Sequence, residues 1–447
     1  MKKLRTRCTA TFLSMVVAQI ASFCLATTAQ SGNVDFNSNG TVRLSVGQIV
    51  HATPHRAQLP GFRDTLWLDG FWTEAIRANF SLTALVNQRL TIAMEMIGGT
   101  AFDFPSPYYA PRTPRTQRSA YSNLRAAYTS YDIIKDGLSF TLGYFPYSAA
   151  PESRNLGDYM FRTGVYPGYI ISGREQARVA GLMLSAPYPS NFRHDLLATI
   201  EVDIEPQYDW SLTYVGRYNL HDWLKLSAGV MLSRILPAIP ERTNPTSLEY
   251  MPNIYKIGYV DPTTGDTTFY RKTGVKLVGR LALDVRKLLF PRSARLGEQD
   301  LVTYVEAAFL GVKDYPGYYE HPSERVPVML GFNLPVFKLL DVLNVELEYY
   351  RSPYWNNPVY QGYAIPYEDW DYSTIPDPKA DLGWRSTAQR LRWSVYGQRS
   401  FFRGMALYAQ AASDHLRPSD GTGEYERYEV FSAPDEWYWQ AGLMFRF

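Results

Sequence analysis

Cysteine is almost absent from this chain of 447 residues. Its two cysteines, Cys8 and Cys24, both lie within the first 29 residues. That stretch has the layout of a secretory signal peptide: basic residues, then the apolar run "FLSMVVAQIASFCLA", then the small residues "TTAQS". We expect residues 1–29 to be removed after Ala29, leaving residues 30–447 as a single domain. The exported chain then has neither a disulfide framework nor a cysteine nucleophile.

Two other readings of the opening segment are less consistent with its residues. A retained membrane anchor would have to accommodate Gln19 within its apolar run. A lipoprotein would be acylated at Cys24, but Phe23 is too large for the residue before that processing site. The signal peptide is therefore the preferred interpretation.

The sequence also lacks a marked excess of positive or negative charge. Four of the 45 basic residues and none of the 43 acidic residues lie in 1–29, so the rest of the chain carries a formal charge of −2. Nothing in this balance indicates a nucleic-acid partner.

Long apolar runs are missing as well. No stretch after residue 29 approaches the ~20 apolar residues of a membrane-spanning helix, and the mean hydropathy is −0.25. Yet 15% of residues are aromatic, including 34 tyrosines. The chain is therefore either a soluble exported protein or a membrane protein whose apolar residues alternate with polar ones, which averaged hydropathy does not detect.

Alternation with period 2 recurs along the chain and favours the second alternative. In "WLKLSAGVMLSR", the residues at 224, 226, 228, 230 and 232 are all apolar, and those between them are mixed. "TGVKLVGRLALDVRK" and "LNVELEYY" follow the same pattern. Many of these segments reach ten residues or more, which is long for a globular sheet and suits a tilted bilayer crossing of ~9–11 residues.

The connections between these segments alternate between tight and long. Tight turns are expected near 87, 134–137, 219–222, 337–341 and 400–404, and long loops near 53–70, 99–118, 147–175, 236–267, 313–324, 352–383 and 412–434. One link, 205–209, is short where a long loop is expected. The pattern predicts an all-β, transmembrane, antiparallel up-and-down β-barrel of about 16 strands (range 14–18), with short periplasmic turns and long outer loops. A soluble sandwich also alternates, but it seldom runs sixteen long strands in a meander.

The chain ends on a two-faced strand, "DEWYWQAGLMFRF". Every second residue from Trp437 to Phe447 is apolar. With the preceding features, this strand resembles the Gram-negative outer-membrane β-barrels, specifically the porin-like channels. The resemblance implies that the barrel-assembly machinery reads the terminal strand, at positions Trp439, Leu443, Phe445 and Phe447. It also implies export to the outer membrane, contact with the lipid bilayer and a possible homotrimer. It implies no cofactor.

The third expected outer loop lies within "FPYSAAPESRNLGDYMFRTGVYPGYIISGREQ". The resemblance implies that residues 147–175 fold inward and narrow the pore. The candidate constriction residues are Glu152, Arg154, Asp158, Arg162 and Arg174. The alternative is a surface loop with solvated charges.

Charged residues of both signs fall on the predicted pore side of the strands. The candidates are Glu201, Asp203, Arg217, Arg280, Glu346, Glu348, Arg390 and Arg392. We expect Glu346 and Glu348 to face Arg390 and Arg392 from the neighbouring strand, as ion pairs that brace the wall rather than as a ladder for a solute. Glu74 alone falls on the predicted lipid side and is expected near the rim.

Motifs for catalysis are missing: there is no GxSxG, HExxH or phosphate loop. Ser413, Asp414 and His415 adjoin in sequence, but successive residues of a strand point to opposite faces. We therefore expect no enzyme and no metal site. The favoured function is passive diffusion of small hydrophilic solutes. The alternative is a non-conducting surface protein whose aromatic outer loops, such as 352–373, bind a glycan or a partner protein.

Overall fold

The computed structural model describes most of the chain after residue 33. The described residues are 34–52, 55–56, 65–66, 68–102, 118–160, 168–169, 177–187, 191–202, 208–238, 256–260, 263–271, 273–313, 321–351, 391–402, 404–417, 431 and 433–447. The predicted signal peptide and the aromatic segment 352–373 lie outside them. Among the described residues, no helix has the length and apolar character needed to cross a membrane.

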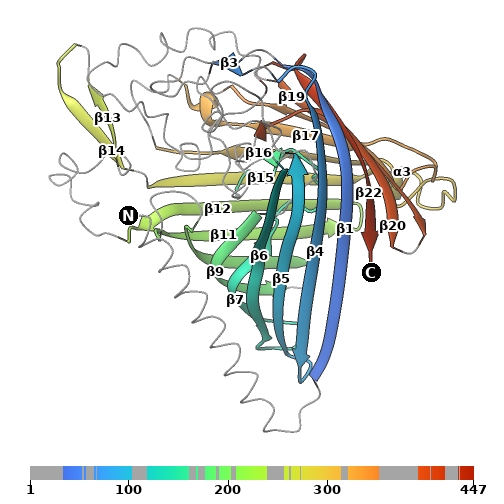
Figure 1. Ribbon diagram of the computed structural model, residues 1–447. Helices are drawn as coiled ribbons and strands as arrows, with labels where there is room; N and C mark the ends of the chain where they lie inside the picture. The colour runs from blue at the N-terminus through green and yellow to red at the C-terminus, as the bar shows by residue number, and fades with distance from the viewer. Residues whose placement is uncertain are drawn as a thin grey trace.

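Sixteen antiparallel strands form one closed barrel (Figure 1), which confirms the expected fold class. Each strand pairs with its neighbours in chain order, and the last strand returns to the first. The strands are β1 (Val34–His51), β4 (Trp72–Val86), β5 (Leu90–Phe102), β6 (Arg118–Asp132), β7 (Ser139–Tyr147), β9 (Ala177–Pro187), β10 (Phe192–Ile200), β11 (Trp210–His221), β12 (Leu224–Leu236), β15 (Gly274–Asp284), β16 (Val302–Phe309), β17 (Val328–Asn333), β18 (Val342–Tyr349), β19 (Leu391–Phe402), β20 (Met405–Ser413) and β22 (Trp437–Arg446).

The last strand closes the barrel against the first. β1 and β22 pair from Thr41 with Arg446 to His51 with Trp437. Beyond the strand, Gly40 and Phe447 exchange two backbone hydrogen bonds of 2.8 and 3.0 Å. A Cβ on Gly40 would lie 2.3 Å from the ring of Phe447, so only glycine leaves room for this ring. Closure leaves no free sheet edge, which explains why the chain end is ordered.

Most links between strands alternate in length, as expected, but the β15–β16 link, residues 285–301, is long at the end where the short turns lie. Short turns join β4 to β5, β6 to β7 and β11 to β12, whereas β7 to β9 and β12 to β15 are joined by long loops. The β10–β11 link is short at the long-loop end. Small sheets in or between the loops are β2 (His55–Arg56) with β3 (Thr65–Leu66), β13 (Lys256–Val260) with β14 (Thr267–Arg271), and β8 (Gly168–Tyr169) with β21 (Leu416–Arg417).

The long loop expected to end at 267 and the alternation in "TGVKLVGRLALDVRK" predict a strand at 268–286, which is longer than the strand in the structure. Residues 267–271 belong instead to the β13–β14 hairpin, which projects beyond the barrel (Figure 1). At its other end, β15 stops at Asp284 and the short helix α3 (Val285–Leu289) begins. The Asp284 side chain accepts a hydrogen bond from the Lys287 backbone N–H at 2.9 Å, which caps the helix. The turn η3 (Pro322–Arg325) precedes β17.

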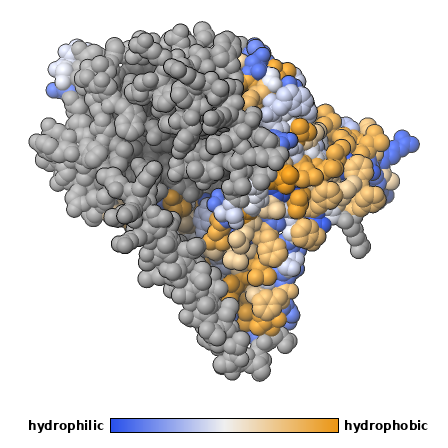
Figure 2. Space-filling view, in the orientation of Figure 1, coloured by the Kyte–Doolittle hydropathy of each residue, from blue (hydrophilic) through white to orange (hydrophobic). Residues whose placement is uncertain are grey.

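The two faces of the wall differ as the alternation predicted. Leu44, Leu281 and Leu347 are exposed on the outside of the barrel, and apolar residues gather over the visible strands in Figure 2. Inside, Glu346 and Gln440 are buried. Glu74 lies on the outer face, exposed, as the third residue of β4 from the long-loop end.

Candidate functional site

After β7 the chain turns into the barrel rather than away from it. We call residues 148–160 the crossing segment. Both of its ends are fixed by Asp158, which accepts hydrogen bonds from Ser148 Oγ at 3.0 Å and from the Ala149 backbone N–H at 3.3 Å. Where the segment starts, Tyr147 donates to Asp195 on β10 at 3.0 Å. Met160 packs in an apolar cluster with Phe145, Leu197 and other residues of this wall.

The middle of the crossing segment binds a carboxylate on β18. The backbone N–H groups of Arg154, Asn155 and Leu156 donate to Glu346 at 2.5, 2.7 and 2.7 Å. Tyr304 on β16 donates its hydroxyl to the same carboxylate at 2.6 Å. β7 and β18 are eight strands apart in a ring of sixteen. The segment therefore reaches from one wall of the lumen to the opposite wall.

Two further carboxylates of the same wall hold Tyr159. Its backbone N–H donates to Glu306 at 2.8 Å and its hydroxyl to Glu348 at 2.9 Å. Burial, together with the charges of Glu348 and Glu306, raises the pKa of Tyr159 well above its usual value, so the phenol stays protonated and donates. His415, just after β20, contacts the other oxygen of Glu348 at 2.6 Å.

Basic residues of β12 and β15 bind the first half of the segment. Arg280 donates to Glu306 at 2.7 Å, to Ser153 Oγ at 2.9 Å and to Glu152 at 3.2 Å. Lys225 contacts Glu152 at 3.1 Å. Burial raises the pKa of the Glu152 carboxyl, but Arg280 and Lys225 outweigh burial and leave this pKa below its usual value.

Two glycines make the close contacts possible. Gly157 in the segment has φ +85°, and a Cβ there would lie 2.3 Å from the terminal methyl of Met329. Gly331 on β17 lies between Tyr304 and Glu346 in the strand register. A Cβ on Gly331 would lie 2.0 Å from the Tyr304 ring, so the ring crosses this glycine to reach the carboxylate.

The predicted constriction residues fall partly in this segment. Glu152, Arg154 and Asp158 belong to it, whereas Arg162 and Arg174 lie outside the described residues. The roles of all five as a pore constriction remain a prediction. The pattern of the sequence did not identify Tyr159, Tyr304 or the two glycines. Tyr304 could have been noticed because it shares the inner face of β16 with Glu306.

The predicted lumen charges have varied partners. Arg217 pairs with Asp195, Glu201 lies 3.5 Å from Arg234, and Arg280 binds the crossing segment. Asp203 and Arg390 lie outside the described residues. β18 and β19 are neighbours as expected, with Glu346 opposite Ser394 and Glu348 opposite Arg392. Arg392 also donates to the carbonyl of Phe431 at 2.9 Å.

The neighbours Ser413, Asp414 and His415 have separate partners. Ser413 donates to the carbonyl of Ala433 at 3.0 Å, and His415 binds Glu348. Asp414 accepts from Asn155 at 2.5 Å and from Tyr438 at 2.9 Å. These contacts connect the crossing segment to the last long loop. Within the described residues, no group of three His, Cys, Asp or Glu side chains is arranged to hold a metal ion.

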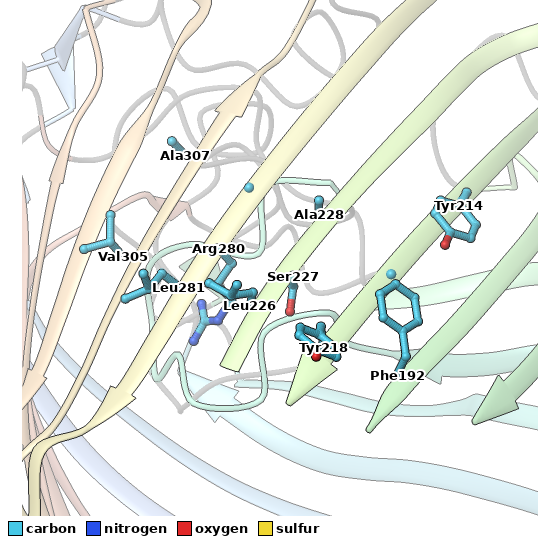
Figure 3. Close-up of a pocket in the computed structure, with 12 residues that line it drawn as sticks. Phe192, Tyr214, Tyr218, Leu226, Ser227, Ala228, Arg280, Leu281, Val305 and Ala307 are labelled. Atoms are coloured by element: carbon cyan, nitrogen blue, oxygen red, sulfur yellow. The ribbon is translucent and has the colours of Figure 1, made fainter. Parts of the chain in front are cut away.

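A separate groove of about 590 Å³ lies on the outer face of the barrel (Figure 3). Its floor is a row of small residues in register across four strands, Gly216, Ala228, Gly279 and Ala307. Aromatic and aliphatic side chains, among them Tyr214, Tyr218, Leu226 and Leu281, border the row. Gly279 and Leu281 flank Arg280 on β15, and successive side chains of a strand point to opposite faces. Because the Arg280 side chain binds the crossing segment inside the barrel, the groove belongs to the outer surface and not to the lumen.

No protein-family model and no curated protein matches the sequence. Among solved structures, the chain is similar to a double mutant of the Rh. blastica porin, with a TM-score of 0.44, 10% identity, and coverage of 92% of this chain and 100% of the other. A triple mutant of the Rhodopseudomonas blastica porin gives a TM-score of 0.42 and 9% identity, with the same coverage. These TM-scores lie below 0.5, so the likeness carries no argument about function.

Proposed function

We propose that this protein is an outer-membrane channel for the passive diffusion of small hydrophilic solutes, and that the crossing segment narrows its pore. The observation that carries the proposal is the segment 148–160, held across the lumen of a closed barrel by carboxylates of the opposite wall. A channel selects solutes by the width and charge of such a narrowing.

The membrane location is supported by the outer face. A closed sheet satisfies every backbone hydrogen bond within the wall, which hydrocarbon requires of any spanning structure. Leu277, Leu330 and Leu407 are exposed on the outside, where water would penalise them and lipid would not. Trp72 and Trp439 make an edge-to-face pair on that face, with ring centroids 5.7 Å apart, as in the aromatic girdles of membrane barrels.

The inner face supports a water-filled path rather than a dry core. Arg125 and Arg178 are ion-paired with Glu95 at 3.7 and 3.2 Å on the wall near β5. A barrel that served only as a scaffold could fill this space with apolar side chains, as small barrels do. Most long loops lie at one end of the barrel and most short turns at the other, which supports the orientation with the short turns in the periplasm.

The second candidate is a closed barrel that acts only at the cell surface. One observation favours it: Leu156 and Tyr159 of the crossing segment are buried against Tyr304 and Met329, as a plug would be. The aromatic loop 352–373, which would bind a glycan or partner in this alternative, lies outside the described residues. The two candidates differ in whether the folded protein passes ions.

Planar-bilayer recording of the purified, refolded protein tests the proposal. We expect stepwise currents from the wild type and larger steps when residues 149–159 are replaced by a short Gly-Ser linker. Liposome swelling with sugars of increasing size should show a matching rise in the size limit. If only the shortened variant gives currents, the closed barrel is favoured. If neither folded protein gives a current, the channel proposal is wrong. Heat-dependent gel mobility checks that each variant is folded.

A further inference from the structure

The link between β15 and β16, residues 285–301, is the long connection at the end of the barrel where most turns are short. It begins with α3, which projects from the barrel (Figure 1). Leu289 and Phe290 have 61% and 49% of their surface exposed. Arg292 and Arg295 follow them and are exposed as well. The link therefore presents apolar and basic side chains side by side.

Two neighbouring turns at the same end repeat this composition. The turn between β17 and β18 exposes Phe337, Lys338 and Leu339. The turn between β19 and β20 exposes Phe401 and Phe402. The exposed fractions of these four apolar side chains run from 52% to 76%. Large apolar side chains that gather on one surface usually mark a contact with a partner or a membrane.

Hydrogen bonds from carboxylates join the three connections into one surface. Asp300, at the end of the link, accepts from the backbone N–H groups of Val336 and Phe337 at 3.3 Å each. Asp341, after the second turn, accepts from the Ser400 backbone N–H at 2.7 Å. We call the exposed part of these connections, residues 288–295, 337–339 and 401–402, the rim surface.

The rim surface is basic as well as apolar. The acids around it serve the fold: Asp300 and Asp341 hold the turns, and Asp284 caps α3 and lies 3.6 Å from Lys287. Glu298 is exposed just beyond the surface. The residues of the rim surface itself include no acid, and its basic residues are Arg292, Arg295 and Lys338.

The 336–339 turn shows that its side chains are not there for the sake of the turn. Phe337 and Lys338 have φ angles of 50° and 64°, in the left-handed region that favours asparagine and glycine and that bulky residues avoid. The β4–β5 turn has the same pattern, with φ 50° at Asn87 and 58° at Gln88. It fills the pattern with polar residues. Turn geometry therefore does not account for the exposed ring of Phe337.

The position of the rim surface favours lipid as its partner. Leu281, Leu330 and Leu347 are exposed on the outer faces of β15, β17 and β18, so the apolar wall continues down to this rim. At the boundary of the hydrocarbon, aromatic rings lie at the level of the head groups. Basic side chains next to apolar ones reach the phosphate groups there, and they attract anionic lipids most strongly.

We propose that the rim surface binds anionic phospholipid of the periplasmic leaflet. Leu289, Phe290 and Phe337 enter the boundary of the hydrocarbon, and the basic residues of the surface bind the phosphate groups. The proposal depends on the membrane location given under the proposed function, but not on conduction. A folded protein that passes no ions would refute the channel and leave this surface to be tested.

Spin labels test whether the rim surface lies in the membrane. Both cysteines of the chain lie in the predicted signal peptide, so one introduced cysteine can carry a label in the refolded mature protein. In liposomes of phosphatidylglycerol, labels at Phe290→Cys and Leu339→Cys should be relaxed more by oxygen than by a water-soluble nickel complex. Asp266→Cys, exposed in the connection between β13 and β14, gives the aqueous reference. Labels at 290 and 339 that match this reference would overturn the proposal in favour of a periplasmic partner.

Retained lipid tests the head group. The wild type is reconstituted with equal amounts of phosphatidylglycerol and phosphatidylcholine, moved to mild detergent, and its bound lipids are counted by mass spectrometry. We expect severalfold more phosphatidylglycerol than phosphatidylcholine, and a ratio near one for Arg292→Gln/Arg295→Gln. The matched control, Arg89→Gln/Lys135→Gln, removes exposed basic residues from two other short turns and should keep the wild-type ratio.

A third variant separates lipid binding from folding. Phe337→Asn/Lys338→Gln gives this turn the residues of the β4–β5 turn, so it should fold at least as well as the wild type. Heat-dependent gel mobility checks this, and the variant should retain less phosphatidylglycerol. Equal retention of the two lipids by the wild type would overturn the proposal. An equal loss in the Arg89→Gln/Lys135→Gln control would also overturn it, because attraction would then follow the charge of the whole rim.

Discussion

Replacing Glu346 with glutamine should release the crossing segment from the wall. Four donors converge on this carboxylate: three successive backbone N–H groups and the Tyr304 hydroxyl. The side chain is fully buried, so water cannot replace a lost acceptor. An amide of the same size keeps one oxygen but presents an NH₂ group where the second oxygen was.

The size of the effect follows from counting donors. If the amide oxygen stays with Asn155 and Leu156, the N–H of Arg154 faces another donor and loses its acceptor, at a cost of about 1–3 kcal/mol. The two bonds that remain become neutral rather than charge-assisted, which weakens each by about 1 kcal/mol. The Tyr304 hydroxyl can turn and accept, so it adds little. Docking of the segment should weaken by roughly 3–5 kcal/mol, or about 10²–10⁴ in its opening equilibrium.

Amide hydrogen exchange followed by mass spectrometry measures this opening directly. Peptides covering 148–160 should exchange about 10²–10⁴ times faster in Glu346→Gln, while barrel-strand peptides keep their protection. Glu95→Gln is the control, because it removes an inner-face carboxylate that is held by Arg125 and Arg178. Unchanged exchange in 148–160 for Glu346→Gln would show that the carboxylate does not hold the segment.

Three other changes test neighbouring features. Gly157→Ala should loosen the segment by about 2 kcal/mol, because φ is +85° there and the wall leaves no room for Cβ; hydrogen exchange of 148–160 that matches the wild type would contradict this. Deleting Phe447 removes its two hydrogen bonds with Gly40 and should reduce the folded fraction in outer membranes severalfold without altering ion selectivity; normal assembly would exclude a role in closure. The pKa of Glu152 is lower in the folded protein than its usual value of about 4.5. The contacts of its carboxylate therefore stabilise the segment fully above about pH 4.5, and this stabilisation is lost as the pH falls through the lowered pKa. Conductance noise should therefore rise below about pH 4.5 in the wild type. In Glu152→Gln the noise should not change with pH in this range.

The wall of the barrel could be predicted because the face on which a strand residue lies, outer or inner, follows from the alternation along the strand. Leu277 and Leu281 lie outside and Arg280 lies inside, as the period of 2 required. α3 was missed because a single capping contact, from Asp284, decides whether β15 continues or turns. The β13–β14 hairpin was missed because short strands in a loop carry too few residues to show a period.

The inward direction of the third loop was expected only from the resemblance, and the residues of the loop do not themselves predict it. The groups that hold it to the wall are mainly backbone N–H donors at 154, 155, 156 and 159. Every residue except proline has this donor, so the sequence carries no sign of the contact. The sequence predicted that Glu346 and Glu348 would pair with Arg390 and Arg392 of the neighbouring strand. Their side chains reach into the lumen, where the segment lies, rather than only along the wall.

The carboxylates of β16 and β18 and the crossing segment hold each other in place. A buried carboxylate without partners would lose several kcal/mol of hydration, so Glu306, Glu346 and Glu348 depend on the segment as much as the segment depends on them. These three carboxylates are therefore satisfied by the segment and offer little charge to a solute. A variant that undocks the segment should uncover them and shift the ion preference toward cations. Glu346→Ala, which keeps Glu306 and Glu348, should show this shift in reversal potential together with faster exchange of 148–160. Faster exchange with an unchanged reversal potential would mean that the carboxylates stay screened without the segment.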